Sequence, residues 1–220
     1  MMSVASYIDH TLLKAFCTAS DIEALCNEAK EHSFAAVCVP PCHVPLAVSL
    51  LQGSQVKVCT VVGFPLGYSD TATKLFETRE MIQHGAQEID VVVNVSWIKS
   101  RQWEKVEAEI EQLSALISSH GAVFKLIFET AYLDMEEILH LTDLCLQYKV
   151  DYLKTSTGFA PKGADLEIVK AIKNRIGNKA KIKASGGISD LETALAFIEA
   201  GADRIGTSSG IKIAEKSSNS

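Results

Sequence analysis

Eight short apolar segments, separated by longer stretches of helical period, constrain the fold of this chain more than any other feature. Most are rich in valine and isoleucine, and they are apolar almost throughout rather than at every second position. Near-continuous apolar strands are typical of parallel sheets covered by helices on both faces. The expected strands are Ile8–Leu12 (the weakest), Ala35–Val39, Val56–Val62, Glu88–Val93, Val123–Phe128, Val150–Lys154, Lys181–Ala184 and Asp203–Thr207.

The intervening segments carry signals for helix starts. Ser20 and Ser189 are each followed by glutamate three residues later, which is the capping-box pattern, and Asp134 is a third candidate N-cap. Strands that alternate with helices leave two architectures: a single-domain α/β barrel of the (β/α)8 (TIM) type, or an open doubly wound sheet. No G-x-G-x-x-G follows the first strand, so the barrel is favoured. We expect it to span residues 1–213, with 214–220 as a disordered tail.

Composition excludes several classes of function. The net charge of −6 argues against a nucleic-acid partner or an anionic membrane surface. No window approaches the roughly 18 apolar residues of a membrane span. The start of the chain lacks the pattern of a secretory signal, and the six cysteines form no C-x-x-C pair, so we expect free thiols and a cytoplasmic location. Cys38 and Cys42, with His43 beside them, fit a buried and a loop cysteine better than a metal site, and we expect neither metal nor cofactor.

Charged residues lie near the ends of several predicted strands. Lys154 closes one strand, Lys183 lies near the end of the next, Asp90 lies within a third, and Asp9 stands in the weak first strand. In a barrel the carboxyl ends of the strands form the active-site face. Burying a lysine is costly unless its charge is paired, and a structural ion pair with Asp90 or Glu129 is one explanation for these lysines. Two lysines on successive strands favour a functional site instead.

Two ammonium groups held close together in a pocket raise the cost of protonating both. One lysine can then attack a carbonyl as a free amine, while a nearby carboxylate moves protons. The loops after the last two strands, 185–187 (SGG) and 206–210 (GTSSG), are rich in glycine and hydroxyl groups. In barrels these loops commonly hold a phosphate through backbone N–H groups and a helix N-terminus. The sequence therefore predicts an amine nucleophile beside a phosphate site.

Across nearly its whole length the chain resembles the deoxyribose-phosphate aldolase family. The stretches that carry the resemblance are IDHTLLK, VCV, VCTVVGFPLG, EIDVVVN, LIFET, LKTSTGF, IKASGGI and RIGTSS. The family implies a (β/α)8 barrel and a metal-independent class I aldolase, a carbon–carbon lyase. Its reaction is the reversible cleavage of 2-deoxy-D-ribose 5-phosphate to acetaldehyde and D-glyceraldehyde 3-phosphate, in deoxyribose phosphate catabolism.

The resemblance also assigns roles to individual residues. Lys154 would form the Schiff base. Lys183 would favour the unprotonated form of the Lys154 amine, and Asp90 would be the carboxylate of a proton relay. Asp9 would lie near a substrate hydroxyl. The other substrate-binding residues would be Thr155, Gly158, Gly186, Gly187, Gly206 and Ser208. The partner would be a small phosphosugar, and the assembly a homodimer or homotetramer.

The chain departs from the family pattern at three places. After DHTLLK, where a proline is common, Ala15 and Phe16 follow. Ser189 stands where members often carry a basic residue near the phosphate, and the last tyrosine is Tyr152, whereas some longer members end in a tail with a tyrosine. Two other interpretations stay open. One is a phosphosugar isomerase or epimerase that uses Asp90 as its base, and the other is a barrel that binds phosphosugars as a sensor without turnover.

Overall fold

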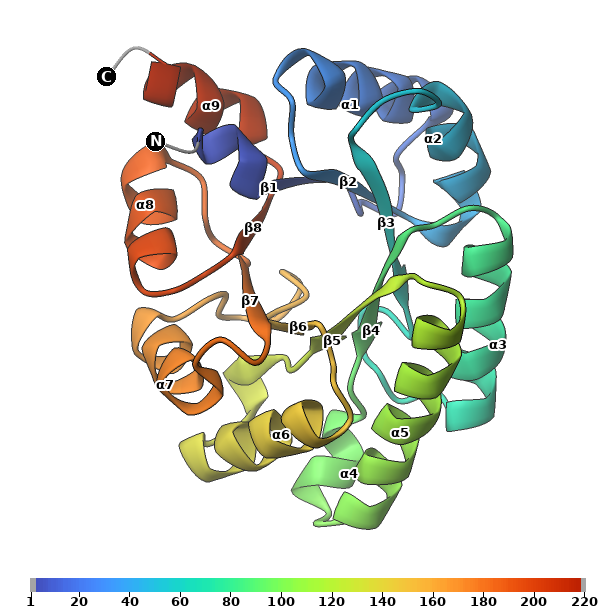
Figure 1. The fold of residues 1–220 in the computed structure, drawn as a ribbon, viewed down its shortest axis with the longest axis vertical. Helices are drawn as coiled ribbons and strands as arrows, with labels where there is room; N and C mark the ends of the chain where they lie inside the picture. Colours follow the sequence, from blue (N-terminus) through green and yellow to red (C-terminus); the bar gives the residue numbers. More distant parts are fainter. Residues whose placement is uncertain (1–2, 219–220) are drawn as a thin grey trace.

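All eight predicted strands are present, and each pairs in parallel with its neighbours along the chain. In this computed structural model, which describes residues 3–218, β1 also pairs with β8 and closes the barrel (Figure 1). The open doubly wound sheet was therefore the wrong alternative. The strands are β1 Ile8–Thr11, β2 Ala36–Val39, β3 Lys57–Val62, β4 Glu88–Val92, β5 Val123–Ile127, β6 Tyr152–Lys154, β7 Lys181–Ser185 and β8 Arg204–Thr207.

The helices form a ring outside the strands (Figure 1). Their apolar faces and the outward side chains of the strands make one continuous core between the two layers. The α-helices are α1 Ala19–Glu31, α2 Val44–Leu50, α3 Thr71–Gln83, α4 Val95–Lys99, α5 Trp103–Ser119, α6 Met135–Gln147, α7 Leu166–Ile176, α8 Leu191–Glu199 and α9 Gly210–Ser218, with 3-10 turns η1 Val4–Tyr7, η2 Pro41–His43 and η3 Thr130–Tyr132. None of the helices in the described part of the chain has the length and hydropathy needed to cross a membrane.

The predicted helix starts were right in one case of three. Asp134 caps α6, and its capping box with Glu137 is present. For α1 the capping residue is Thr18, not Ser20, and for α8 it is Asp190, not Ser189. Before α1 the competing caps are the hydroxyls of Thr18 and Ser20, and before α8 they are the Ser189 hydroxyl and the Asp190 carboxylate. All of these side chains can cap a helix, so the sequence pattern alone does not choose between them.

The C-terminal segment shows that the predicted disordered tail was wrong. Helix α9 runs from Gly210 to Ser218, so residues 214–218 are helical and not a disordered tail. Ile213 and Ala214 are buried and belong to the core, which explains why the helix continues. Residues 219 and 220, also part of the predicted tail, lie outside the described residues.

Strand register divides the barrel interior into two halves. On β2 and β3 the inward residues are small and apolar, and Cys38, Cys59 and Val61 belong to a separate cluster there. On the remaining strands the inward positions carry charge, because alternate residues point to the same side. Asp90 is in register with Lys125, and Lys154 with Lys183. The fold therefore places the charged side chains of distant segments against one another inside the barrel.

Candidate active site inside the barrel

Seven charged side chains form one connected cluster in the barrel interior. The cluster consists of Asp9, Glu88, Asp90, Lys125, Lys154, Lys183 and Arg204. They come from six of the eight strands, and a charge without a partner would be costly at these buried positions. Ion pairs link every member to the rest. We call these seven residues the charged cluster.

Asp90 lies at the centre of the charged cluster. Its Oδ2 accepts hydrogen bonds from Lys154 Nζ at 2.7 Å and from Lys183 Nζ at 2.8 Å. Its Oδ1 accepts from Lys125 Nζ at 2.9 Å and from the thiol of Cys59 at 3.1 Å. Burial alone would raise the pKa of this carboxyl group, but the three ammonium groups hold the pKa of Asp90 well below its usual range. Asp90 is therefore a permanent anion that holds the two lysines of the predicted site side by side.

Lys183 is fixed as a cation by two carboxylates. Its Nζ lies 2.6 Å from Asp9 Oδ2 in addition to its bond with Asp90. Burial would lower the pKa of Lys183, but Asp9 and Asp90 hold that pKa well above its ordinary value. Asp9 in turn lies 2.6 Å from the Arg204 guanidinium, and its own pKa is lowered. Lys154 therefore has a neighbour that stays positively charged.

Lys154 occupies the boundary between the charged cluster and a cavity of about 430 Å³. Its side chain is 3% exposed, whereas Lys125 and Lys183 are fully buried. The rest of the cavity wall comes from the C-terminal ends of β1, β7 and β8 and from the loops after β1, β6, β7 and β8. Of the predicted catalytic residues, Lys154 is thus the one that reaches the cavity, and Lys183 and Asp90 lie beneath it.

The predicted phosphate loops line the same cavity. Gly158, Gly186, Gly187, Gly206 and Ser208 all contribute to its wall. Gly186 and Gly187 have φ angles of 89° and 80°, a left-handed backbone that glycine adopts without strain. Helix α9 begins at Gly210, two residues after Ser208. The cavity therefore combines a lysine at one end with glycine- and hydroxyl-rich loops.

Two predicted binding residues are not part of the cavity wall. Thr155 is fully buried, and its hydroxyl bridges to the backbone of Ser185 on the neighbouring strand, donating to the carbonyl and accepting from the N–H at 3.1 Å each. Asp9 is also fully buried, among Lys125, Lys183 and Arg204. Thr155 therefore contacts a residue of the cavity wall, and Asp9 contacts the rest of the charged cluster. Neither lines the cavity itself.

Sequence reasoning missed three members of the charged cluster. Lys125 Nζ lies 2.6 Å from Glu88 Oε2 and 2.9 Å from Asp90 Oδ1, and Arg204 pairs with Asp9 and Glu88. The signal was present in the segment VFKLIF, where a lysine stands between apolar residues of a strand. A buried lysine requires a carboxylate opposite it, and Lys125 was as informative as Lys183.

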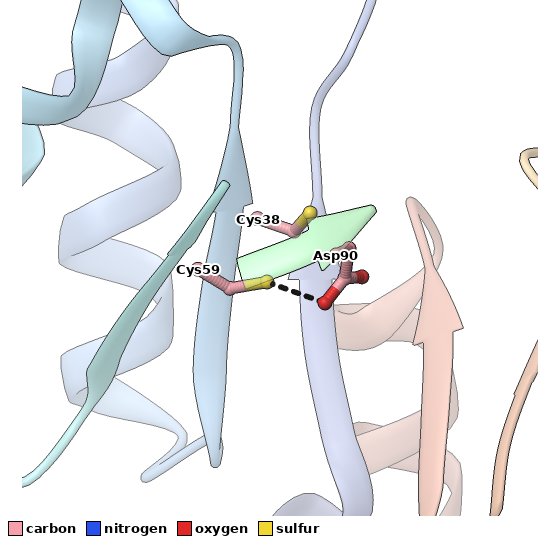
Figure 2. Close-up of side chains that lie close together, drawn as sticks. All are labelled: Cys38, Cys59 and Asp90. Atoms are coloured by element: carbon pink, nitrogen blue, oxygen red, sulfur yellow. Dashed lines mark hydrogen bonds between the residues drawn. The ribbon is translucent and has the colours of Figure 1, made fainter. Parts of the chain in front are cut away.

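Two buried thiols lie beside Asp90 (Figure 2). The ligand atoms of Cys38, Cys59 and Asp90 are all within 4.8 Å of one another, and Figure 2 shows the Cys59 thiol directed at the Asp90 carboxylate. We call these three residues the sulfur–carboxylate cluster. Their atom types would suit a thiophilic metal ion. However, Lys125 Nζ lies 3.2 Å from Cys59 Sγ and also contacts Asp90. A metal cation at this position would face an ammonium group at contact distance, so the donor set does not fit one well.

Comparisons with known proteins show the family of the chain. Residues 3–216 match the family model described as DeoC/LacD family aldolase. The chain is 50% identical over 216 residues to a deoxyribose-phosphate aldolase of Thermoanaerobacter sp. (strain X514), covering 98% of this chain and 97% of the relative. It is 50% identical over 210 residues to one of Mannheimia succiniciproducens, with 96% and 93% covered. A tetrameric deoxyribose phosphate aldolase structure from Aeropyrum pernix aligns with a TM-score of 0.90 at 35% identity, covering 97% of this chain and 90% of that one.

Proposed function

Because the chain belongs to the DeoC/LacD family of aldolases, we propose that it cleaves 2-deoxy-D-ribose 5-phosphate reversibly through a Schiff base on Lys154. The products would be acetaldehyde and D-glyceraldehyde 3-phosphate, and the reaction would serve deoxyribose phosphate catabolism. The observation that carries this proposal is the position of Lys154. Its amine stands at the cavity floor and shares one oxygen of Asp90 with the permanently charged Lys183. A second ammonium beside Lys183 is disfavoured, which makes Lys154 the amine that can act as a nucleophile.

The proposed reaction follows from this arrangement. Lys154 attacks C1 of the open-chain aldehyde, and loss of water gives a protonated imine. The products contain two and three carbons, so the bond that breaks joins C2 and C3. A base removes the proton of the C3 hydroxyl, and the electrons of that O–H bond form the carbonyl of D-glyceraldehyde 3-phosphate. The electrons of the C2–C3 bond move into the C1–C2 bond and the C=N electrons onto the imine nitrogen, which gives an enamine on Lys154. Protonation of C2 and hydrolysis then release acetaldehyde.

The glycine- and hydroxyl-rich loops of the cavity wall would hold the phosphate of this substrate. Backbone N–H groups of the loops at Gly186–Gly187 and Gly206–Ser208, with the start of α9, offer donors and positive potential to an anion. Ser189 also lines the cavity, so its hydroxyl is placed to donate a hydrogen bond where a basic side chain would add charge. Phosphate affinity would then depend on hydrogen bonds more than on ion pairs.

We also propose metal-independent chemistry, a homo-oligomeric assembly and a cytosolic location. Lys183 and the protonated imine supply the positive charge that a metal ion would otherwise provide. The tetrameric relative from Aeropyrum pernix supports the assembly, and the six free cysteines suit a reducing compartment.

The test is to trap the imine. The protein is incubated with acetaldehyde, reduced with borohydride, and digested for peptide mass spectrometry. The expected adduct lies on the peptide that contains Lys154, and Lys154→Met is the control that should remove it. Labelling spread evenly over surface lysines, unchanged in this variant, would contradict the Schiff-base mechanism and favour the isomerase interpretation.

A further inference from the structure

Cys38 and Cys59, the two thiols of the sulfur–carboxylate cluster, take no part in the reaction described above. They stand in register on the neighbouring parallel strands β2 and β3. Both are free thiols, and both are fully buried in the small apolar cluster inside the barrel. Their sulfur atoms lie within 4.8 Å of each other, and Figure 2 shows both beside Asp90. The fold therefore holds two oxidisable side chains next to the carboxylate at the centre of the charged cluster.

The backbone geometry permits a disulfide between these two strands. Neighbouring strands lie about 4.8 Å apart, which falls within the range of about 4.4 to 6.8 Å between the Cα atoms of disulfide-bonded cysteines. Side chains in register on parallel strands point in the same direction, so the Cβ atoms lie nearer to this strand spacing than to the mean of about 3.8 Å found in disulfides. The bond would form with some strain, and a strained disulfide is easily reduced. The pair is therefore suited to a reversible bond.

The two thiols differ in reactivity. The neighbouring Cys59 thiol contributes most to lowering the pKa of the Cys38 thiol, the Lys183 ammonium group adds to this effect, and burial opposes both. Burial raises the pKa of the Cys59 thiol well above its ordinary value. The thiolate is the nucleophile in cysteine oxidation. Cys38 is therefore the thiol that attacks an oxidant, and Cys59 is the one that keeps its proton.

The pair lies close to the cavity. Leu13 lines the cavity and also packs against the apolar cluster that contains both thiols. Leu13 itself is only half-buried. A partly exposed side chain thus separates this cluster from the cavity, and hydrogen peroxide is an oxidant only slightly larger than water.

We propose that hydrogen peroxide oxidises Cys38 and Cys59 to a disulfide that reversibly lowers the activity of the site. The Cys38 thiolate attacks one peroxide oxygen, the O–O bond breaks, and hydroxide leaves, so Cys38 becomes a sulfenic acid. The Cys59 sulfur then attacks the Cys38 sulfur, the S–O bond breaks, and the leaving hydroxide takes the Cys59 proton as water. In sum, two thiols lose two electrons and two protons to the peroxide, which gives one disulfide and two molecules of water. A thiol reductant reverses the reaction.

The disulfide acts on the site through Asp90. Cys59 Sγ donates to Asp90 Oδ1 at 3.1 Å and lies 3.2 Å from Lys125 Nζ. The disulfide removes this thiol proton and draws the sulfur away from both groups, since bonded sulfur atoms lie about 2.05 Å apart. Asp90 holds the Lys154 amine through its other oxygen, so a shift of this carboxylate displaces the nucleophile. The effect on activity rests on the proposed function, whereas formation of the bond does not.

The test measures the bond and the activity separately. Wild-type protein, Cys38→Ser, Cys59→Ser and the control Cys42→Ser, which removes an exposed thiol, are treated with hydrogen peroxide. Samples are alkylated in denaturant and digested with trypsin without reduction, which places Cys38 on peptide 31–57 and Cys59 on peptide 58–74. Cleavage of 2-deoxy-D-ribose 5-phosphate is measured before treatment, after treatment and after dithiothreitol. Each rate is compared with that of the same protein before treatment.

In treated wild type, peptide 31–57 should be linked to peptide 58–74, without the two thiol hydrogens. The cleavage rate should fall by about tenfold or more, because displacements of about 1 Å in an active site can cost about 100-fold, and dithiothreitol should restore it. Cys42→Ser should form the same link and lose the same fraction of its activity. Cys38→Ser and Cys59→Ser should form no link, and Cys38→Ser should keep its rate under the same treatment.

Absence of this link in treated wild type would overturn the inference. A link from peptide 31–57 only to peptide 15–30, which carries Cys17, would also overturn it. So would a link that leaves cleavage unchanged, or an equal loss of activity in Cys38→Ser, because oxidation of another residue would then explain the loss. The wild-type peptide map and its reversal decide the question even if a variant does not fold. If reduced wild type shows no cleavage, the aldolase function fails, while the linked peptides still decide whether the bond forms.

Discussion

Replacing Lys183 with methionine tests the central electrostatic argument, because it removes a charge next to Lys154. The two amines contact the same oxygen of Asp90 at 2.7 and 2.8 Å. Ordinary hydrogen-bond angles then place the nitrogens about 4 to 5 Å apart. At an effective dielectric constant of about 20, two unit charges at that separation repel by about 3 to 4 kcal/mol. Replacing Lys183 with methionine removes this repulsion.

The sign of the expected change follows directly. Without Lys183, protonation of Lys154 becomes easier, so the free amine forms only at higher pH. The acid limb of the pH–rate profile should move to higher pH, so the rate at pH 7 should fall and should recover as the pH is raised. The assay is steady-state cleavage measured from pH 6 to pH 10. Lys181→Met is a matched control, because it removes an exposed lysine from the same strand.

Folding must be measured alongside the rate. Removing one partner from buried ion pairs costs about 3–5 kcal/mol, so urea unfolding should be followed at each pH. A folded Lys183→Met protein with the wild-type pH profile would refute the electrostatic role of Lys183. A rate that falls by the same factor at every pH would refute it as well, because that result indicates altered positioning.

Three further substitutions or treatments test the proposed site. Lys154→Met should lower cleavage more than 100-fold, a barrier increase of about 2.7 kcal/mol or more, while circular dichroism shows an intact fold; smaller losses would contradict covalent catalysis. Gly206→Ala would place a Cβ 2.9 Å from the Cβ of Ser185. It should therefore destabilise the barrel by about 1–3 kcal/mol in urea titrations, and an unchanged midpoint would show that β7 and β8 can accommodate the added methyl group. Dialysis against EDTA should leave the cleavage rate unchanged, whereas a loss restored by metal would assign an ion to the sulfur–carboxylate cluster.

The fold could be predicted because its main determinant is periodic. Each buried strand is a short apolar run, and a closed parallel sheet covered by helices needs eight of them. Helix starts were less predictable, because Thr18 and Ser20 both offer a hydroxyl within two residues of the start of α1. The prediction of a disordered tail after Ile213 was wrong. The sequence there is mostly polar and does not indicate that Ala214 is buried.

The charged cluster was only partly predictable, because ion pairs depend on register between strands. Lys154 and Lys183 lie near strand ends, where a barrel carries its site residues, whereas Lys125 lies in the middle of a strand. Its importance appears only when strand pairing sets it opposite Asp90. Glu129 was considered as a lysine partner, but its hydrogen bonds go to Thr157. Glu129 has a left-handed backbone, which the segment LIFET does not reveal.

The balance of charge inside the barrel supports the proposal that Lys154 is the reactive lysine. The interior holds the carboxylates Asp9, Glu88 and Asp90 and the cationic side chains Lys125, Lys154, Lys183 and Arg204. With every group ionised, one positive charge is in excess, which is costly at buried positions. An arginine does not lose its proton, and carboxylates hold the pKa values of Lys125 and Lys183 well above normal. Of the four cationic side chains, Lys154 is the one that lines the cavity.

This balance predicts that charge changes of opposite sign act in opposite directions. Glu88→Gln removes a carboxylate, raises the positive excess and further favours the free amine. It should move the acid limb of the pH–rate profile downward, whereas Lys183→Met moves it upward. The shift should be the smaller of the two, because Glu88 contacts Lys125 and Arg204 and not Lys154. Parallel pH titrations of both variants provide the measurement. Shifts in the same direction would show that local contacts, and not the balance of charge, determine the reactivity of Lys154.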